Sequence, residues 1–402
     1  MADSKKIIIK ADLRPCYYDQ FRCLAAECRL SCCEDWRIPF DKKDYLTLKR
    51  QSGSPDLEER LAHGVRRVRE KTGFYGEFNM SKGPCPLLGA DHLCILQKEN
   101  GHGVLPRVCR SFPRSEAYER SGYFERSLTP ACEGVLGLLW DLPEGVGFLS
   151  DPLPREKYQA FIPTNPGALT HRFQEIRGAC IDLLQDRRTS LPQRILLMGL
   201  ALRELADGER DIPRWAERTA ALPESMDGRV LLAEGKAALA MNLSNNLRML
   251  SSIRGTSPEL RELKADLIQG LGVQPDGEGT TIPLTPYETA RERYQEQFGE
   301  RDYFMENLMV SLFFHLRIPS TSGDGELWRS YVNFCNLYSF YRFMAVMSCR
   351  EGASGGREEL FRLLVHASRL LIHNGAHQSA LRDELFENDS ATLAHMAILL
   401  CG

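Results

Sequence analysis

Cysteine is concentrated in one part of this sequence. Of its 13 cysteines, eight lie between residues 23 and 132, whereas residues 133–402 hold only four. A thiolate is a strong donor to soft or borderline metals, and loops can bring several thiolates to one place. These eight cysteines are therefore the predicted ligands of one or two polynuclear metal sites. Their order is Cys23-x4-Cys28-x3-Cys32-Cys33, then Cys85-x8-Cys94-x14-Cys109, and finally Cys132.

The compartment decides how this cysteine content is interpreted. Residues 1–10 contain only the short apolar run Ile7-Ile8-Ile9, which is far short of a signal-peptide core. No stretch approaches the roughly 18 to 20 apolar residues that span a bilayer. We therefore expect a cytoplasmic protein, in which thiols stay reduced and abundant cysteine indicates metal binding or catalysis rather than disulfides.

The spacing of the cysteines leaves the metal open. Structural zinc usually binds to C-x2-C pairs, which this sequence lacks, so zinc is the second choice. The ferredoxin run C-x2-C-x2-C is absent too. The C-x3-C-x2-C triad of radical enzymes that use S-adenosylmethionine begins at Cys28 and Cys32 but fails at Asp35. An iron-sulfur cluster is the preferred occupant, although no iron-sulfur spacing is matched literally.

Loops and short elements must position these thiols. Ser54 and Pro55 are typical of a helix start, and apolar residues at helical spacing then predict a helix over 55–71. Gly-Pro, Gly-Ala-Asp and Leu-Pro turns precede Cys85, Cys94 and Cys109, as suits loops around a metal centre. Short strands are expected near 74–80 and 123–128.

The rest of the chain is predicted to be helical. We predict a mainly α protein with two domains, a cysteine-rich cluster domain over 1–150 with short strands and loops, and an all-α domain over 151–402. With 43% apolar residues, 26% charged residues and a net charge of -3, nothing indicates a nucleic-acid or membrane partner. The expected helices cover 155–185, 192–207, 229–250, 287–298, 303–316, 327–347 and 357–373, and loops are expected at 270–286, 319–325 and 352–356.

Two sequence blocks resemble the flagellin lysine N-methylase family, FliB. The first runs from Tyr17 to Cys23 and on through Cys28, Cys32-Cys33, Trp36, Ile38 and Asp41. The second holds Cys85-Pro86-Leu87-Leu88, Asp91-His92-Leu93-Cys94-Ile95 and Cys109-Arg110-Ser111-Phe112-Pro113-Arg114, and it is also similar to small zinc- or iron-chelating proteins. Looser matches, at Glu306-Asn307, Phe313-Phe314 and between Ser368-Arg369 and His373-Asn374, favour the methylase family.

The resemblance implies a [4Fe-4S] cluster and methyl transfer from S-adenosylmethionine to surface lysines of flagellin, with the helical domain helping to hold flagellin. The sequence has no G-x-G-x-x-G turn between a strand and a helix, so the donor must bind in another way. One hypothesis is that an iron with an open site chelates the donor, with Arg110 or Arg114 pairing to its carboxylate. A structural role for these two arginines around the cluster is equally open.

Other polar and aromatic residues near the first cysteines are candidates as well. Tyr18 and Asp41 could accept a proton from the attacking lysine, although Asp41 before Lys42-Lys43 is also suited to cap a helix. Trp36 could stack on the donor or shield the cluster from water. Two rival functions remain open, namely a metal-binding or sensing module without turnover and an electron-transfer protein.

Overall fold

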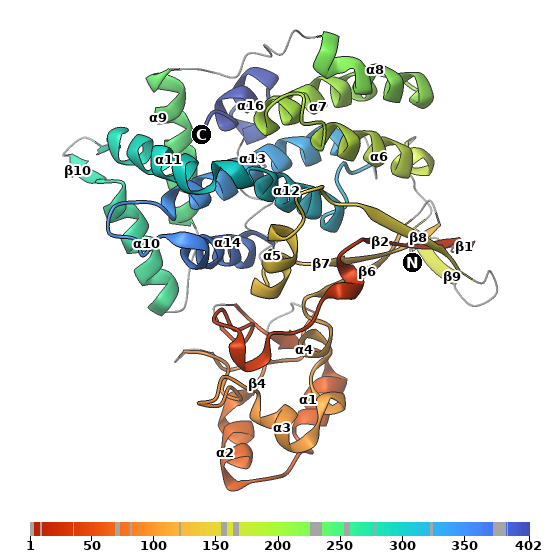
Figure 1. The fold of residues 1–402 in the computed structure, drawn as a ribbon. Coiled ribbons are helices and arrows are strands. Elements are labelled where there is room, and N and C mark those ends of the chain that lie inside the picture. The colour runs from red at the N-terminus through yellow and green to blue at the C-terminus, as the bar shows by residue number, and fades with distance from the viewer. Residues whose placement is uncertain are drawn as a thin grey trace.

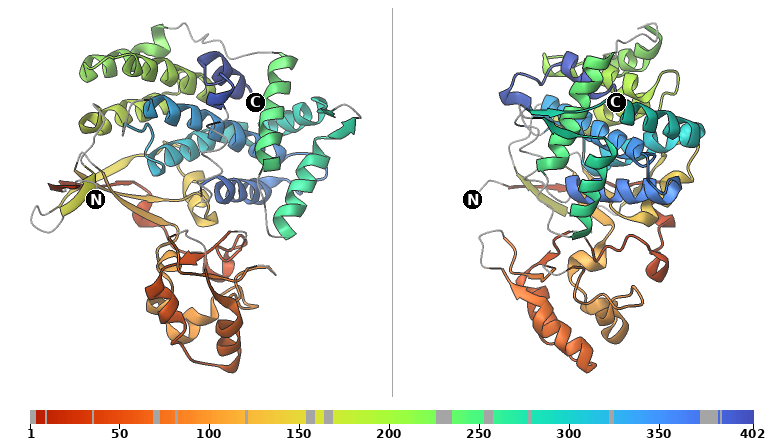
Figure 2. Two further views of the ribbon diagram at one scale, coloured as in Figure 1. Left: turned by 180° about the vertical axis from the view of Figure 1, so that it is seen from behind. Right: turned by 90° about the vertical axis from the view of Figure 1, so that its left-hand side faces the viewer.

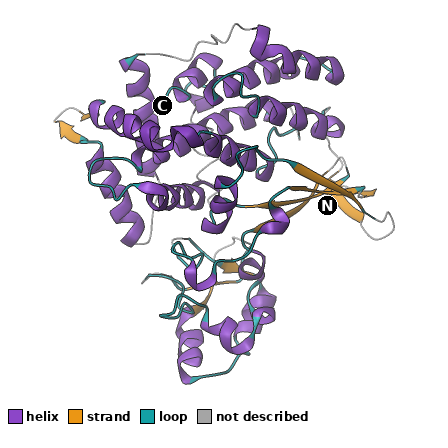
Figure 3. Ribbon diagram, viewed as in Figure 1, coloured by secondary structure: helices purple, strands orange, loops and turns teal. Residues whose placement is uncertain are grey.

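A computed structural model describes residues 4–8, 10–34, 36–68, 73–80, 83–119, 122–153, 159–163, 169–225, 235–252, 258–276, 279–321, 325–372, 383 and 385–402. In these residues a small lobe stands apart from a large helical body, and a twisted sheet runs along the side of the body that faces the lobe (Figure 1). Helices dominate the body (Figure 3). The predicted mainly α class is confirmed. No helix in the described part of the chain has the length and apolar character needed to cross a membrane.

The small lobe packs four short helices around a three-stranded antiparallel sheet of order β3-β5-β4. Ser54 caps the helix predicted at 55–71, but that helix ends at Gly64 because Val65 pairs with Phe78 across the sheet. The elements are β3 (Pro39–Phe40), α1 (Lys42–Leu48), α2 (Pro55–Gly64), β4 (Val65–Arg67), β5 (Gly76–Phe78), α3 (Ile95–Asn100), η3 (His102–Val104) and α4 (Arg107–Ser111).

A four-stranded sheet of order β6-β7-β2-β8 connects the lobe to the body. Strand β2 runs parallel to β7 and antiparallel to β8, so the chain before the cysteines and the chain after them lie side by side. The strands are β2 (Ala11–Pro15), β6 (Arg114–Glu119), β7 (Tyr123–Leu128) and β8 (Phe148–Pro152), and β1 (Ser4–Ile8) pairs separately with β9 (Gln159–Pro163). The strands predicted near 74–80 and 123–128 are confirmed by β5 and β7.

The helical body is a layered bundle seen from two further sides in Figure 2. Its α-helices are α5 (Glu133–Trp140), α6 (Phe173–Leu184), α7 (Leu191–Ala206), α8 (Ile212–Ser225), α9 (Lys236–Ser252), α10 (Pro258–Gly270), α11 (Thr285–Phe298), α12 (Tyr303–His315), α13 (Glu326–Met347), α14 (Gly356–Ile372) and α16 (Leu393–Leu399). Single-turn helices are η1 (Tyr18–Gln20), η2 (Ala25–Glu27), η4 (Thr170–Arg172) and η5 (Gly299–Arg301), and β10 (Gln274–Asp276) pairs with β11 (Gly279–Thr281).

Most of the predicted helices occur close to their expected bounds. The helix predicted over 155–185 is wrong in its first part, because residues 159–163 form β9 and α6 begins only at Phe173. Helices α5, α8, α10 and α16 of the body were not predicted. The expected loop at 270–286 contains the β10–β11 pair. Residues 319–321 and 325 form no helix or strand, as expected, and residues 322–324 of that predicted loop lie outside the described residues. The loop predicted at 352–356 ends one residue earlier, because α14 begins at Gly356.

The described residues form two separate hydrophobic cores. The small core holds residues of the lobe between Ile38 and Leu105, and the large core takes Tyr17, Tyr18 and Phe21 together with residues from 128 onward. Helix α13 lies at the centre of the large core, with nearly every residue buried. The segment just before the first cysteines is therefore anchored in the helical body. The domain division at residue 150 stays a prediction.

The close packing of α7 on α13 gives a stability prediction. A Cβ added at Gly199 would lie 2.2 Å from the hydroxyl oxygen of the buried Tyr331. Gly199→Ala should therefore destabilise the protein by about 1–3 kcal/mol through overpacking, measured by chemical denaturation. The same change at Gly178 in α6, where no atom lies within 4 Å of the added Cβ, should leave stability unchanged or raise it. Equal effects at both sites would contradict this packing.

Candidate metal centre

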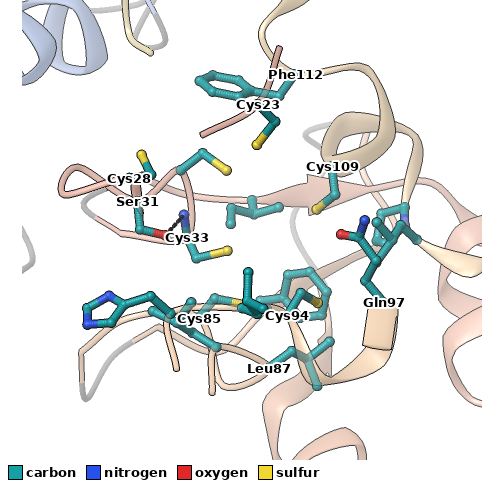
Figure 4. A pocket seen from close by; sticks show the side chains of 18 of the residues that line it. Cys23, Cys28, Ser31, Cys33, Cys85, Leu87, Cys94, Gln97, Cys109 and Phe112 are labelled. Carbon is teal, nitrogen blue, oxygen red and sulfur yellow. Dashed lines mark hydrogen bonds between the residues drawn. The ribbon is translucent and has the colours of Figure 1, made fainter. Parts of the chain in front are cut away.

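One cavity of about 460 Å³ opens between the cysteine loops of the small lobe. Seven of the eight predicted ligands line it, and their thiols project from several different segments (Figure 4). The eighth, Cys132, lies outside the lining but packs against the large core at the start of α5. The lining cysteines are Cys23, Cys28, Cys32, Cys33, Cys85, Cys94 and Cys109.

Backbone hydrogen bonds bring the second cysteine block to the first. The amide of Cys85 donates to the carbonyl of Cys33 at 2.7 Å. The turn that follows folds back, because Leu88 and Cys94 form an isolated antiparallel bridge and Cys94 then precedes α3. Cys109 comes from the centre of α4. The turns predicted from glycine and proline thus place three thiols from separate segments around one space.

The loop that carries Cys28 to Cys33 rests on the start of α5. The Cys28 thiol donates to the Glu133 carboxylate at 3.6 Å, and the amides of Arg29 and Leu30 donate to the same oxygen at 2.8 and 3.2 Å. Glu133 directly follows Cys132. This carboxylate therefore holds the first cysteine loop beside the last predicted ligand.

A second anchor for this loop comes from the distant helix α14. Arg369 is 4% exposed, and its Nη2 donates to the carbonyls of Leu30 and Ser31 at 2.8 and 2.9 Å. Its Nη1 donates to the carbonyl of Glu34 at 3.4 Å. Arg29 also forms an ion pair with Glu358 of the same helix. The helical body thus fixes the conformation of a loop that lies more than 330 residues earlier in the chain.

Glu133 and Arg369 were both missed as site residues. A signal existed for Arg369, because Ser368-Arg369 opens one of the loose matches to the family; the end of that match, His373-Asn374, lies outside the described residues. Of the other loose matches, Glu306 accepts from Arg187 and Arg194, and Asn307 donates to the carbonyls of Leu139 and Leu142. These two residues join helices of the body rather than line the cavity.

Burial raises the pKa of several of the eight cysteine thiols. Burial raises the pKa of Cys28 to about 12 and that of Cys132 to about 11, and it raises the pKa of Cys109 well above its usual range. Neighbouring cysteines act in the same direction, since Cys32 and Cys33 raise the pKa of Cys109 further. These thiols are protonated near neutral pH as they stand, so a bound metal would have to displace their protons.

The remaining walls of the cavity are largely apolar. The rings of Trp36 and Phe112 lie with their centroids 5.4 Å apart, and Trp36 Nε1 donates to the carbonyl of Cys32 at 2.7 Å. Aliphatic residues that line the cavity include Ile38 and Leu87. Trp36 therefore lines the same cavity as the cysteines, and its role as a stacking partner or a shield stays a prediction.

The donor set fits a thiolate-bound cofactor in its chemistry. Within the described parts of the chain, no three or more Cys, His, Asp or Glu side chains are arranged as a ready ligand set for a metal ion. The thiols instead line the walls of a space. Cysteine thiolates hold [4Fe-4S] clusters, with each cysteine bound to a different iron, so the ligands of a cluster stand further apart than those of a single ion.

The other candidate residues lie around the cavity rather than in its lining. Arg110 is exposed on α4 and donates from Nη1 to the carbonyl of Gly103 at 3.1 Å. Arg114 begins β6, with its guanidinium 5.0 Å from the centre of the Phe21 ring. Tyr18 is buried in the large core, and burial raises its pKa. The catalytic and donor-binding roles of these residues stay predictions.

Asp41 has a clear structural role. Its Oδ1 accepts from the amide of Asp44 at 2.8 Å and so caps α1. The capping alternative is thus confirmed, and its role as a proton acceptor stays a prediction. Asp44 in turn accepts from the amide of Arg107 at 2.9 Å, which fixes the start of the α4 segment that carries Cys109. The cap thus links α1 to the segment that carries Cys109.

Comparisons with known proteins agree on one family. The family model described as the FliB lysine N-methylase C-terminal domain matches residues 177–399, which is more than half of the 402 residues. A protein named Lysine-N-methylase from Salmonella typhimurium is 29% identical over 136 residues, which make up 33% of this chain and 33% of that protein. The chain thus matches about a third of the length of this relative.

Two further matches carry related names. A Lysine-N-methylase from Salmonella choleraesuis is also 29% identical over 136 residues, again 33% of both chains. A protein named Flagellar biosynthetic protein FliU from Salmonella muenchen has the same identity over 136 residues, which cover 78% of its length and 33% of this chain. No solved structure matches this chain.

Proposed function

Because the chain belongs to the FliB lysine N-methylase family, we propose that it transfers the methyl group of S-adenosylmethionine to lysine side chains of flagellin. The single observation that carries this proposal is the apolar cavity lined by seven cysteines in a chain of this family. The names of the relatives, a lysine methylase and a flagellar biosynthetic protein, support lysine as the acceptor and flagellin as the substrate.

A [4Fe-4S] cluster is the cofactor we propose for the cavity, and zinc is the alternative. When bound, such a cluster would offer iron as a Lewis acid or an electron carrier beside the methyl donor. The residues that would hold it are four of the eight cysteines. The Cys28–Cys33 loop would be kept in place by Glu133 and Arg369, whose hydrogen bonds do not depend on the metal.

The apolar part of the cavity suits both reactants. Methyl transfer requires a neutral lysine amine, whose ordinary pKa is about 10.4, to attack a positively charged sulfonium group. Aromatic faces attract such cations, and Trp36 and Phe112 supply two of them at the cavity. Burying the lysine side chain among residues such as Leu88 and Leu93 would favour its neutral form. The cavity would thus position the donor and activate the acceptor.

The displaced proton needs an acceptor, and His92 is the residue we propose for it. Its imidazole lines the cavity two residues before Cys94. A positioned general base contributes typically about 100-fold or more to a rate. His92→Gln should therefore lower kcat for methyl transfer about 100-fold while leaving the iron content unchanged. His102→Gln is the matched control, because His102 is an exposed histidine of the same lobe that does not line the cavity. Equal rates for His92→Gln and wild type would rule out this role.

The direct test is the intact mass of flagellin after incubation with S-adenosylmethionine and the protein purified without oxygen. We expect mass increments of one or more methyl groups with wild type and an unchanged mass with Cys32→Ala. Flagellin that stays unmodified by a wild-type protein with a full iron complement would overturn the proposal and favour a metal-binding module without turnover.

A further inference from the structure

The eight cysteines divide into a set that lies against the small core and a set that does not. The inner cysteine set belongs to the small core or packs against it, and Cys85 in this set is 5% exposed. In the outer cysteine set, Cys132 packs against the large core, and Cys23 and Cys32 are exposed. The inner cysteine set is Cys33, Cys85, Cys94 and Cys109, and the outer cysteine set is Cys23, Cys28, Cys32 and Cys132.

The inner cysteine set is assembled by the lobe itself. The Cys85 amide donates to the Cys33 carbonyl at 2.7 Å, and the bridge between Leu88 and Cys94 returns the chain to the same wall. All four thiols line the cavity. In Figure 4 the side chains of Cys33, Cys85, Cys94 and Cys109 surround one part of the space, while Cys23 lies beside Phe112 and Cys28 beside Ser31. Four thiols from four segments therefore share one region of the wall.

The outer cysteine set gathers instead at the first turn of α5. A Cβ added at Gly134 would lie 3.3 Å from Phe21 and 3.5 Å from Leu24, so the chain on both sides of Cys23 touches this turn. Cys28 reaches the same turn through its 3.6 Å contact with Glu133. Cys132 occupies the N-cap position of α5. Three thiols thus converge on one helix start, and Cys32 follows on the same loop as Cys28.

The adjacent pair Cys32 and Cys33 marks the boundary between the sets. Cys33 is half-buried against the small core, whereas Cys32 is exposed. The two thiols interact with each other, because the Cys33 thiol raises the pKa of Cys32, so the two sets adjoin at this pair. The Cys32 carbonyl is also tied to the Trp36 indole at 2.7 Å, which fixes the turn between them.

We propose that each set holds its own iron-sulfur cluster, the inner one completing the small lobe and the outer one, with its exposed thiols, lying where substrates can reach it. Four thiolates are the ordinary ligand complement of one cluster. This inference rests on the proposed cofactor of the methylase function, but it concerns the number and the ligands of the clusters rather than the reaction.

Paired substitutions test the division. Iron and acid-labile sulfide are counted per chain in the anaerobically purified full-length protein, in Cys23→Ser/Cys28→Ser and in Cys85→Ser/Cys94→Ser. Wild type should carry twice the iron of a single [4Fe-4S] cluster, and the outer pair of substitutions should halve it. In that variant the inner thiols should stay protected from alkylation by iodoacetamide, as read by peptide mass spectrometry.

The iron content of Cys23→Ser/Cys28→Ser is the decisive result. The inner substitutions also change side chains of the small core, so a loss of iron in that variant could come from damage to the fold. A wild type with the iron of one cluster would overturn the inference, as would an outer variant that loses all of its iron or none. These counts do not depend on turnover. If the protein carries two clusters but transfers no methyl group, the proposed function is wrong and this inference stands. If the protein transfers methyl groups with only one cluster, this inference is wrong and the proposed function stands.

Discussion

Replacing Arg369 with alanine should abolish most of the iron content and lower methyl transfer by more than 10-fold. The guanidinium is buried and donates to three carbonyls of the loop that carries Cys28, Cys32 and Cys33. Hydrogen bonds that involve a charged group contribute about 1.5–3 kcal/mol each, so their loss would free this loop. Iron per chain and circular dichroism measure the effect on the cofactor and on the fold.

Two controls separate anchoring from general damage. Arg369→Lys keeps the charge but loses the forked geometry of the guanidinium, so an intermediate iron content is expected. Arg357→Ala changes an exposed arginine at the other end of α14 and should retain full iron. A well-folded Arg369→Ala protein with wild-type iron and activity would show that α14 does not hold the cysteine loop.

Glu306→Gln should lower the free energy of unfolding by about 3–5 kcal/mol. Glu306 is 1% exposed, and its carboxylate lies 2.6 Å from Nη1 of the buried Arg194 and 2.9 Å from Nη2 of Arg187. Removing one member of a buried ion pair leaves the other charge uncompensated, which costs about that much. The amide keeps the shape of the side chain, so the effect reports on charge. Urea denaturation followed by tryptophan fluorescence measures it.

The matched control is an arginine that directly follows Arg187 in the sequence. Arg188 pairs with Asp186 and Glu224, but its side chain is 45% exposed. Exposed ion pairs contribute about 0–1 kcal/mol, so Arg188→Ala should have a small effect. A loss below about 1 kcal/mol for Glu306→Gln would mean that Arg194 finds other partners and that this network does not stabilise the junction of α7 and α12.

The sequence predicted those parts of the molecule that local patterns determine. Helix α14 has a long periodic apolar face, α13 is a long helix buried on most sides, and α7 begins at a capping box, so their bounds were predicted closely. Cysteine density located the cavity, because seven of the eight clustered cysteines line it. Helix α10 was missed, since its apolar residues are few and its burial comes from contacts with distant segments.

Contacts between segments that are far apart in the sequence could not be predicted from local patterns. Nothing near Arg369 in the sequence indicates that it contacts residues 30–34. That contact depends on how α14 packs against the cysteine loop in the folded protein. Glu133 also looks like an ordinary first-turn acid of α5 until the cysteine loop is placed on it. The early end of α2 at Gly64 has the same cause, since Val65 pairs with a strand formed later in the chain.

The central claim is that methyl transfer depends on metal held by the cysteine-lined cavity. The most direct measurement follows the initial rate of methyl transfer to flagellin in samples of one preparation stripped of metal and then loaded to a graded iron content. The account predicts a rate that rises in proportion to bound iron and falls to background in the stripped protein. A stripped, folded protein that methylates flagellin at the rate of the fully loaded one would contradict it.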